Sequence, residues 1–358
     1  MGFKEEYLKP GKYPYFIAEI GINHNGYMNL AKRMIDASKN AGADAVKFQK
    51  RNFDTLLLPG VVIPEPTGYL SKDENDLPTE DKAFGTWTYP DKRLEFTDRQ
   101  VVQLWSYAES KGLDFIVSPW EEDSVDFLVD RDAKVIKLAS IDTTNYQFCE
   151  YIANKRIPTI VSTGMCNYDQ LNVVWDIFYT YKCPMMFLHC TSAYPSPIED
   201  KNLNCIPYMR MEYDMDIGFS GHGVGIEGAL GAIALGANVV EKHVTLSKKM
   251  SGPDQAASLE FVDFAELIRL SNNVAVALGS DTKGFLPSEQ TLHNILSKRI
   301  VTSCAIKKGV VITKDMLRTV VTKKEGGFFP EYYYHILGSV AVRDLQPFHI
   351  IEDQDIAT

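Results

Sequence analysis

Several features that would identify other classes of protein are missing from this sequence. The first 15 residues contain no apolar segment like the core of a signal peptide, and no run of about 18 apolar residues exists, so we expect neither secretion nor a membrane span. The six cysteines, at positions 149, 166, 183, 190, 205 and 304, include no Cys-x-x-Cys pair. In a chain of 358 residues they are typical of reduced thiols in a cytoplasmic protein.

Basic segments are also missing. The formal net charge is −10 and no run of Lys and Arg occurs, which argues against nucleic acid as a partner. An acidic protein can still bind an anionic small molecule, because a pocket can be locally positive. Hydrophobic residues make up 45% of the chain and charged residues 23%, a balance that excludes a disordered protein.

What the sequence does contain is a regular alternation of short β-rich runs and helical patterns over residues 1–250. The β-rich runs are mostly continuous apolar segments, as expected of strands buried on both faces. We predict eight strands, at 16–21, 45–49, 114–118, 135–139, 159–162, 185–189, 216–220 and 239–244. Helical periodicity with capping residues predicts helices at 29–40, 98–110, 226–235 and 261–278.

Eight strands that alternate with helices favour a closed (β/α)8 barrel of the TIM type. The main rival is an open doubly wound sheet, which usually has about five to seven strands. Neither a GxGxxG motif nor a Walker A motif supports that rival. One connection, residues 50–96, is long and rich in Pro, Gly, Asp and Lys, a composition that fits either a functional lid or a solvated insertion.

The pattern changes near residue 285. Short β-rich runs at 300–305, 310–312 and 339–341, together with Gly-Gly and Lys-Gly turns, predict a small β-rich domain with two similar turn-and-strand units. We therefore expect a barrel domain over 1–284, a linker over 285–298 and the small domain over 299–358.

Polar residues mark the carboxyl ends of the predicted strands. In a barrel, side chains at these ends face the active site. The residues at or just after the strand ends are Glu19, Lys47, Gln49, Ser118, Lys137, Ser140, Asp142, Ser162, Ser192, Tyr194, Ser220, His222, Glu241 and His243.

Lys47 and Lys137 stand inside otherwise apolar runs, where a buried charge must find a partner. A single lysine in a strand usually points to solvent, but two lysines beside several hydroxyls favour a phosphate site. Glu19 and Asp142 are candidate acid-base carboxylates or, in the plainer interpretation, salt-bridge partners.

His222 and His243 end adjacent predicted strands, so their imidazoles can converge. A histidine at a strand end is more often structural than a ligand, yet two imidazoles with open positions suit a divalent metal completed by water and substrate. These residues predict a barrel enzyme that acts on an anionic, phosphorylated small molecule, and they leave the reaction open.

Longer segments around the same residues resemble the sialic acid synthase family, the nonulosonic acid synthases. The segments are IAEIGINHNGYMNLAKRMIDASKNAGADAVKFQ (17–49), STGM (162–165), HCTSAYPSP (189–197), GFSGHGVGIE (218–227), EKHVTL (241–246) and GPDQAASLE (252–260). Two C-terminal segments, RIVTSCAIKKGVVITKDML and GGFFPEYYYHILG, resemble the family's antifreeze-like SAF domain. The resemblance covers nearly the whole chain and implies a TIM barrel followed by a β-rich SAF domain.

This resemblance implies a metal-dependent condensation of phosphoenolpyruvate with N-acetylmannosamine or a related amino-sugar aldehyde, with release of phosphate. It implies that His222 and His243 hold Mn²⁺ or Mg²⁺. The implied phosphoenolpyruvate cradle consists of Lys47, Ser118, Lys137, Ser140, Ser162, Ser192 and Ser220. Gln49 and Tyr194 match other pocket positions, Glu19 and Asp254 match sugar-contacting carboxylates, and Asp142 matches a carboxylate near the condensing carbon.

The resemblance also implies a domain-swapped homodimer in which the SAF domain caps the partner's active site. In that cap, bacterial sialic acid synthases use an Arg toward the N-acetyl group, and this sequence has Lys323, which lacks the planar fork. Gln255 likewise stands where a His is common. The acceptor therefore stays open among N-acetylmannosamine and the precursors of pseudaminic, legionaminic and other sugar acids, phosphorylated or not.

Two other classes remain as alternatives at this point. One is a phosphate-sugar aldolase or isomerase on the same barrel, which would use a Schiff-base lysine. The other is a non-catalytic protein with the SAF-like segment as a binding module.

Overall fold

The computed structural model describes residues 3–8, 14–58, 63–65, 87–89, 92–250, 252–322 and 325–357. The chain forms two compact units, Met1–Gly279 and Ser280–Thr358. Within the described residues, no helix is both long and apolar enough to cross a membrane.

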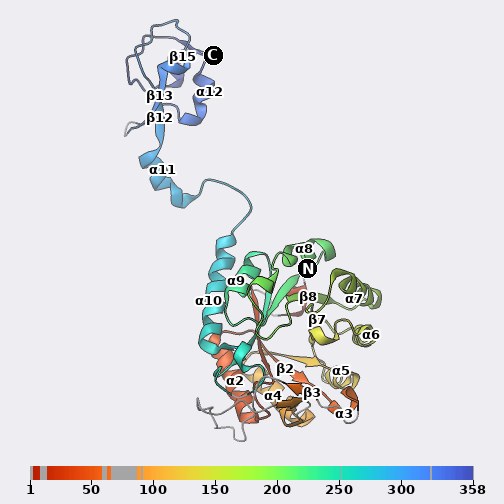
Figure 1. Cartoon of the computed structure of the whole chain (residues 1–358). Helices are drawn as coiled ribbons and strands as arrows, with labels where there is room; N and C mark the ends of the chain where they lie inside the picture. Colours follow the sequence, from red (N-terminus) through yellow and green to blue (C-terminus); the bar gives the residue numbers. More distant parts are fainter. Residues whose placement is uncertain are drawn as a thin grey trace. The chain divides into compact units, whose positions relative to one another are not determined.

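The first unit is a nearly closed barrel of eight parallel strands (Figure 1). The strands are β1 (Tyr15–Gly21), β2 (Ala45–Lys50), β5 (Asp114–Pro119), β6 (Ile136–Leu138), β7 (Thr159–Ser162), β8 (Met185–Cys190), β9 (Ile217–Gly221) and β10 (Val239–Thr245). Hydrogen-bonded neighbours follow the order β5-β2-β1-β10-β9-β8-β7-β6, and β5 and β6 lie side by side where the ring closes. The predicted (β/α)8 barrel is therefore confirmed, and the open doubly wound sheet is wrong.

Helices surround the strands and short segments join them (Figure 1). The longer helices are α2 (Met28–Ala41), α4 (Asp98–Ser110), α5 (Glu122–Val129), α6 (Tyr146–Lys155), α7 (Tyr168–Tyr181), α8 (Cys205–Tyr213), α9 (Glu227–Ala234) and α10 (Phe261–Leu278). The shorter elements are α1 (Phe3–Tyr7), η2 (Ser140–Asp142), η3 (Glu199–Lys201), η4 (Gln255–Ala257) and β11 (Leu259–Glu260), which pairs with β10. Local signals set the boundaries: Thr97 and Gln100 form a capping box that starts α4, and Gly42 at φ +94° ends α2.

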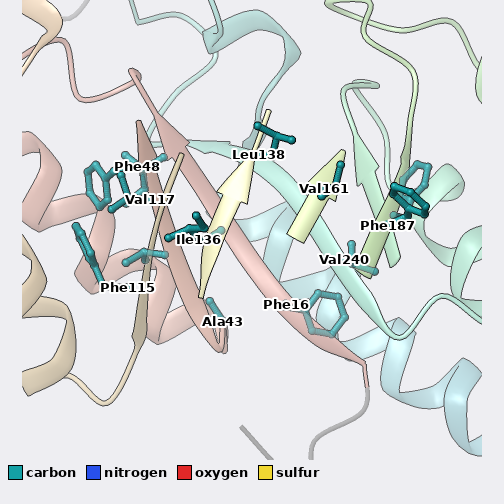
Figure 2. Packing of buried hydrophobic residues seen from close by; sticks show 14 of the residues in the cluster. Phe16, Ala43, Phe48, Phe115, Val117, Ile136, Leu138, Val161, Phe187 and Val240 are labelled. Carbon is teal, nitrogen blue, oxygen red and sulfur yellow. The ribbon is translucent and has the colours of Figure 1, made fainter. Parts of the chain in front are cut away.

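The strands present apolar side chains outward to the helices. Phe16, Val117, Ile136, Val161 and Val240 belong to one large buried cluster that also contains residues of the surrounding helices (Figure 2). Removing each such side chain from water contributes about 1.5–3 kcal/mol, so this layer dominates the stability of the barrel.

The inner face of the barrel has an apolar floor and a polar upper layer. Ile17, Ala45, Ile116, Val135, Ile160 and Val239 form the floor together with Phe3 and Leu8 at the N-terminus. Because side chains alternate along a strand, the residues two positions further on share the same inner face. These residues are Glu19, Lys47, Ser118, Lys137, Ser162 and Glu241, and all of them are buried.

The long connection after β2 begins and ends beside a buried ion pair. Arg51 follows β2 directly and pairs with Glu95, just before α4. The described parts between them are α3 (Phe53–Leu56), an antiparallel pair of β3 (Ile63–Glu65) with β4 (Trp87–Tyr89), and η1 (Lys92–Leu94). The ion pair joins the two ends of the connection at the rim of the barrel.

The second unit is small and β-rich. It contains two antiparallel strand pairs, β12 (Lys298–Thr302) with β13 (Leu317–Val321) and β14 (Val340–Ala341) with β15 (Ile356–Ala357). Its helical elements are η5 (Pro287–Glu289), α11 (Gln290–Leu296), η6 (Lys314–Met316), η7 (Pro330–Tyr332), α12 (Tyr333–Ile336) and η8 (Asp353–Asp355). Its core is a cluster of Ile300, Ile306, Ile312, Ile336, Ala341, Leu345 and Ile351. Its identity as an SAF domain, and the linker bounds 285–298, stay predictions.

Candidate active site

The polar upper layer of the barrel opens into a cavity of about 260 Å³. Twelve of the predicted residues line it, namely Glu19, Lys47, Gln49, Ser118, Lys137, Ser140, Ser162, Ser192, Tyr194, Ser220, His222 and His243. The cavity also has wall residues that the sequence reasoning did not select: Trp120, Ala139, Ile141, Met165 and Glu241.

Lys47 is the centre of a buried charge network. Its Nζ lies 2.9 Å from Glu19 Oε2, 3.8 Å from Glu241 Oε2 and 3.1 Å from Ser118 Oγ, to which it donates a hydrogen bond. Burial raises the pKa of Glu19 to about 7 even though Lys47 opposes that shift and Glu241 adds to it. Burial alone would lower the pKa of Lys47, but the two carboxylates outweigh it and hold the pKa above its usual value. Lys47 therefore stays charged, and Glu19 can gain or lose a proton near neutral pH.

Lys137, on β6, lines the same cavity and has no carboxylate within ion-pair distance among the described residues. Its Nζ donates to Ser162 Oγ at 2.6 Å and to the carbonyl of Leu138 at 3.0 Å. Burial lowers its pKa. Two lysines and their hydroxyl partners thus meet in one cavity, an arrangement that suits a phosphate or carboxylate group.

Gly164 allows the serine hydroxyls to crowd together after β7. A Cβ on Gly164 would overlap the Ser192 hydroxyl and lie 2.7 Å from Ser140 Oγ. Its backbone N–H donates to Ser140 Oγ at 3.1 Å. The Ser-Thr-Gly segment after β7 therefore allows two loop hydroxyls to reach the cavity wall, where only glycine fits.

The two predicted histidines face each other, with ring centroids 5.4 Å apart. His222 Nδ1 lies 3.0 Å from the carbonyl of Thr191, so this nitrogen carries the proton and Nε2 accepts from Tyr194 Oη at 3.1 Å. Burial lowers the pKa of His243 well below its usual value, and its Nδ1 is buried without a hydrogen-bond partner, 4.0 Å from Asp254 Oδ2. His243 is therefore neutral, which is the form that binds a metal ion.

This pair of imidazoles fits a metal ion only if other ligands complete the shell. Among the described residues, no group of three or more His, Cys, Asp or Glu side chains is placed to hold an ion. The unbonded Nδ1 of His243 and the carbonyl-oriented ring of His222 are compatible with a site completed by water and substrate.

Two predicted residues are not among the wall residues of the cavity, and a third is outside the described residues. Asp142 ends η2 and does not line the cavity; its Oδ2 is buried without a hydrogen-bond partner, and burial raises its pKa to about 6. Asp254 precedes η4 and reaches toward His243 without lining the cavity. Lys323 lies outside the described residues.

Glu241 is the functional candidate that the sequence reasoning noted but did not select. It accepts a hydrogen bond from Ser220 Oγ at 3.0 Å and stands 3.8 Å from Lys47 Nζ. Strand periodicity was the signal available, because Glu241 is two residues before His243 and shares its face.

Comparisons with known proteins show the family to which the chain belongs. Residues 34–283 match the NeuB family. The chain is 39% identical over 330 residues to N-acetylneuraminate-9-phosphate synthase of Homo sapiens, which covers 92% of this chain and 89% of that one. It is 32% identical over 330 residues to N,N'-diacetyllegionaminic acid synthase of Legionella pneumophila, with 91% and 89% covered. The crystal structure of N-acetylneuraminic acid synthetase from Leptospira borgpetersenii in complex with citrate is similar with a TM-score of 0.67 and 30% identity, over 78% of this chain and 90% of that one.

Proposed function

Because this chain belongs to the NeuB family, as its resemblance to sialic acid synthases predicted, we propose that it condenses phosphoenolpyruvate with an N-acetylmannosamine-type amino-sugar aldehyde to give a sialic-acid-like nonulosonic acid and phosphate. The observation that carries this proposal is the convergence of Lys47, Lys137 and several serine hydroxyls with His222 and His243 on one barrel cavity.

Phosphoenolpyruvate has two anionic groups, a phosphate and a carboxylate, that need separate cationic partners. Lys47 and Lys137 supply two ammonium groups, each already next to a serine hydroxyl. Charge-assisted hydrogen bonds from these groups balance the bound anion. The raised pKa of Glu19 supports this role, since a protonated Glu19 leaves the cavity more positive.

The proposed reaction forms a carbon–carbon bond and a bond between C2 and a water oxygen, and it breaks the bond between C2 and the phosphate oxygen. The two protons of that water go to the alkoxide left by the aldehyde and to the departing phosphate. C3 of phosphoenolpyruvate attacks the aldehyde carbon of the sugar, and C2 becomes an oxocarbenium ion that water traps. The tetrahedral intermediate then collapses to a ketone and expels phosphate, with the lysines balancing its charge. Glu19 and Asp254 are the proposed sugar-contacting carboxylates, and Asp142 is the proposed carboxylate near C2.

A divalent metal, Mn²⁺ or Mg²⁺, is part of the proposal. His222 and His243 would hold it, and a metal in this place polarises a carbonyl as a Lewis acid. The Tyr194 hydroxyl lies 3.1 Å from His222 Nε2, so a metal bound through this nitrogen would replace that hydrogen bond.

The remaining expectations keep the status of proposals. We propose a homodimer in which the small second unit is an SAF domain that caps the partner's cavity, with Lys323 facing the acceptor. The acceptor class is drawn from the relatives: a product phosphorylated at C9, as in the name of the human relative, requires an acceptor phosphorylated at C6, because condensation adds three carbons. Precursors of legionaminic acid are the other class that the relatives suggest.

A second candidate function rests on Lys137. Burial lowers the pKa of this amine, a property that Schiff-base lysines of aldolases share. Borohydride reduction in the presence of a phosphate sugar would trap such an adduct on Lys137.

The test of the proposed function is acceptor-dependent phosphate release from phosphoenolpyruvate. Acceptors to compare are N-acetylmannosamine, its 6-phosphate and a diacetamido-hexose, each with and without Mn²⁺. We expect release with one acceptor class and a product heavier than the acceptor by three carbons. Release with none of them, under conditions where the protein is folded, would contradict the proposal.

A further inference from the structure

A second cavity, of about 570 Å³, lies in the barrel unit beside the first one. Its walls are largely apolar, with Pro195, Pro197, Ile198, Phe219, Val224 and Ala229 among them. Two lysines, Lys201 and Lys242, also line it, and they are only 6% and 2% exposed. The reaction proposed above uses neither lysine.

Both ammonium groups converge on Gly223. Lys242 Nζ donates to the carbonyl of Gly223 at 2.6 Å and to that of Gly225 at 3.4 Å. Lys201 Nζ donates to the hydroxyl and the carbonyl of Ser196, and it would lie 2.8 Å from a Cβ placed on Gly223. An ammonium group has three N–H donors, so each lysine keeps one donor that these contacts do not use.

Among the described residues, carboxylates act on these two lysines only from beyond ion-pair distance. Within the described part of the chain, neither Lys201 nor Lys242 forms an ion pair, although Glu227 lines the cavity from its exposed side. Burial, with repulsion from Lys201 and Lys248, lowers the pKa of Lys242 to about 7, and burial also lowers the pKa of Lys201, because the charged forms are poorly compensated here. An anion between them would supply both the missing charge and the missing acceptors.

We propose that this cavity is a second anion site that binds a phosphate group, either inorganic phosphate or a phosphomonoester. Phosphate offers several acceptor oxygens to the two remaining N–H donors, and its charge matches the uncompensated pair. Ser196 stands beside Lys201 as a further hydroxyl, and the apolar walls leave room for the organic part of a monoester.

The two cavities share no wall residue, but neighbouring residues of the same strands and loops line one cavity and then the other. Glu241 and His243 line the first cavity, and Lys242 between them lines the second. In the same way, His222 lines the first cavity and Gly223, the next residue, lines the second. Because Lys242 holds the turn that follows His222, occupancy of the second cavity would order a wall of the first.

Calorimetric titration of inorganic phosphate into the full-length chain, without phosphoenolpyruvate, tests the site. A Lys137→Met background weakens phosphate binding in the first cavity, so that the second is measured. In this background we expect binding to persist and to weaken about tenfold or more when Lys201→Met or Lys242→Met is added. Lys201→Arg keeps the charge and should keep the affinity, and Lys111→Met, at an exposed lysine, is the matched control.

Unchanged affinity in both methionine variants would overturn the proposal. Because these variants also lose contacts to loop carbonyls, a crystal of the wild-type protein soaked in tungstate gives an independent result. Anomalous density between Lys201 and Lys242 supports the site, and an empty cavity beside an occupied first cavity overturns it.

The choice of ligand is tested by comparing affinities. Tighter binding of glycerol 3-phosphate than of inorganic phosphate would identify a monoester site, and equal affinity would identify a site for inorganic phosphate. A preference for acetate would contradict a phosphate site. None of these results depends on whether the proposed condensation occurs.

Discussion

Lys47 and Glu19 form an ion pair of 2.9 Å inside the barrel, where both side chains are almost completely buried. They come from adjacent strands, in register on the inner face. A pair in this position is not an ordinary surface salt bridge, because each charge depends on the other for solvation.

Lys47→Met should destabilise the protein strongly at pH 8. The substitution leaves Glu19 buried without its ion-pair partner and removes one of the two lysines that act on Glu241, and breaking one partner of a buried pair costs about 3–5 kcal/mol. Denaturant unfolding measures the loss. Lys111→Met removes an exposed lysine that lies 2.8 Å from Asp36, and should cost less than about 1 kcal/mol. Equal losses in the two variants would show that the Lys47 network contributes no more than a surface pair.

Binding of phosphoenolpyruvate should take up a proton at about pH 7.5. The pKa of Glu19 is about 7 because of burial, and an incoming anion raises it further. Calorimetry in two buffers with different ionisation enthalpies measures the proton uptake. Glu19→Gln should lower it, and identical buffer dependence in wild type and variant would remove Glu19 from this role.

Asp142→Asn should cut turnover, spare phosphoenolpyruvate binding and change how stability depends on pH. The folded-state pKa of Asp142 is about 6, above its usual value of 3.8, because of burial. Between about pH 4 and 6 the folded state keeps a proton that the unfolded state releases, so stability falls as pH rises through that window. The variant should lack this fall and be up to about 3 kcal/mol more stable than wild type at pH 7.5. Denaturant unfolding at pH 4, 6 and 7.5 checks the stability, and unchanged turnover would exclude Asp142 from the mechanism.

His243→Asn should abolish tight binding of Mn²⁺, which electron paramagnetic resonance detects through the signal of the free ion. The neutral ring and unbonded Nδ1 of His243 match the form in which an imidazole binds a metal ion, so we expect this residue to be a ligand. His24 is also a buried, neutral histidine, and it stacks on Phe96 outside the cavity. His24→Asn is therefore the matched control, and a loss of Mn²⁺ binding in both variants, or in neither, would contradict the assignment.

The sequence predicted the barrel because each strand has an unambiguous local signal. Continuous apolar runs gave the eight strands nearly to the residue, and β7 has the predicted bounds. The lysines at 47 and 137 stood out because an apolar strand excludes an unpaired charge, and both do point inward. Alternation along the strands then explains why the polar residues meet in one cavity.

Other features depend on contacts that no local pattern shows. Lys47 is on β2 and Glu241 is on β10, and these two strands flank β1 in the ring. The contact between the two side chains follows from this strand order, which no local sequence pattern shows. Asp142 follows a strand as the predicted residues do, but it ends the η2 turn and is not among the residues that line the cavity. The second cavity arises where two loops pack together, so Lys201 and Lys242 had no shared signal in the sequence.

The central claim is that the first cavity, the candidate active site, joins phosphoenolpyruvate to an aldehyde. An oxygen label tests this claim most directly. With phosphoenolpyruvate carrying ¹⁸O at the bridging oxygen, collapse at C2 must send the label into phosphate. We predict that the released phosphate carries ¹⁸O and that release requires an amino-sugar acceptor. We also predict that the Lys137→Met variant releases no phosphate. Unlabelled phosphate, or phosphate released without an acceptor, would contradict the condensation.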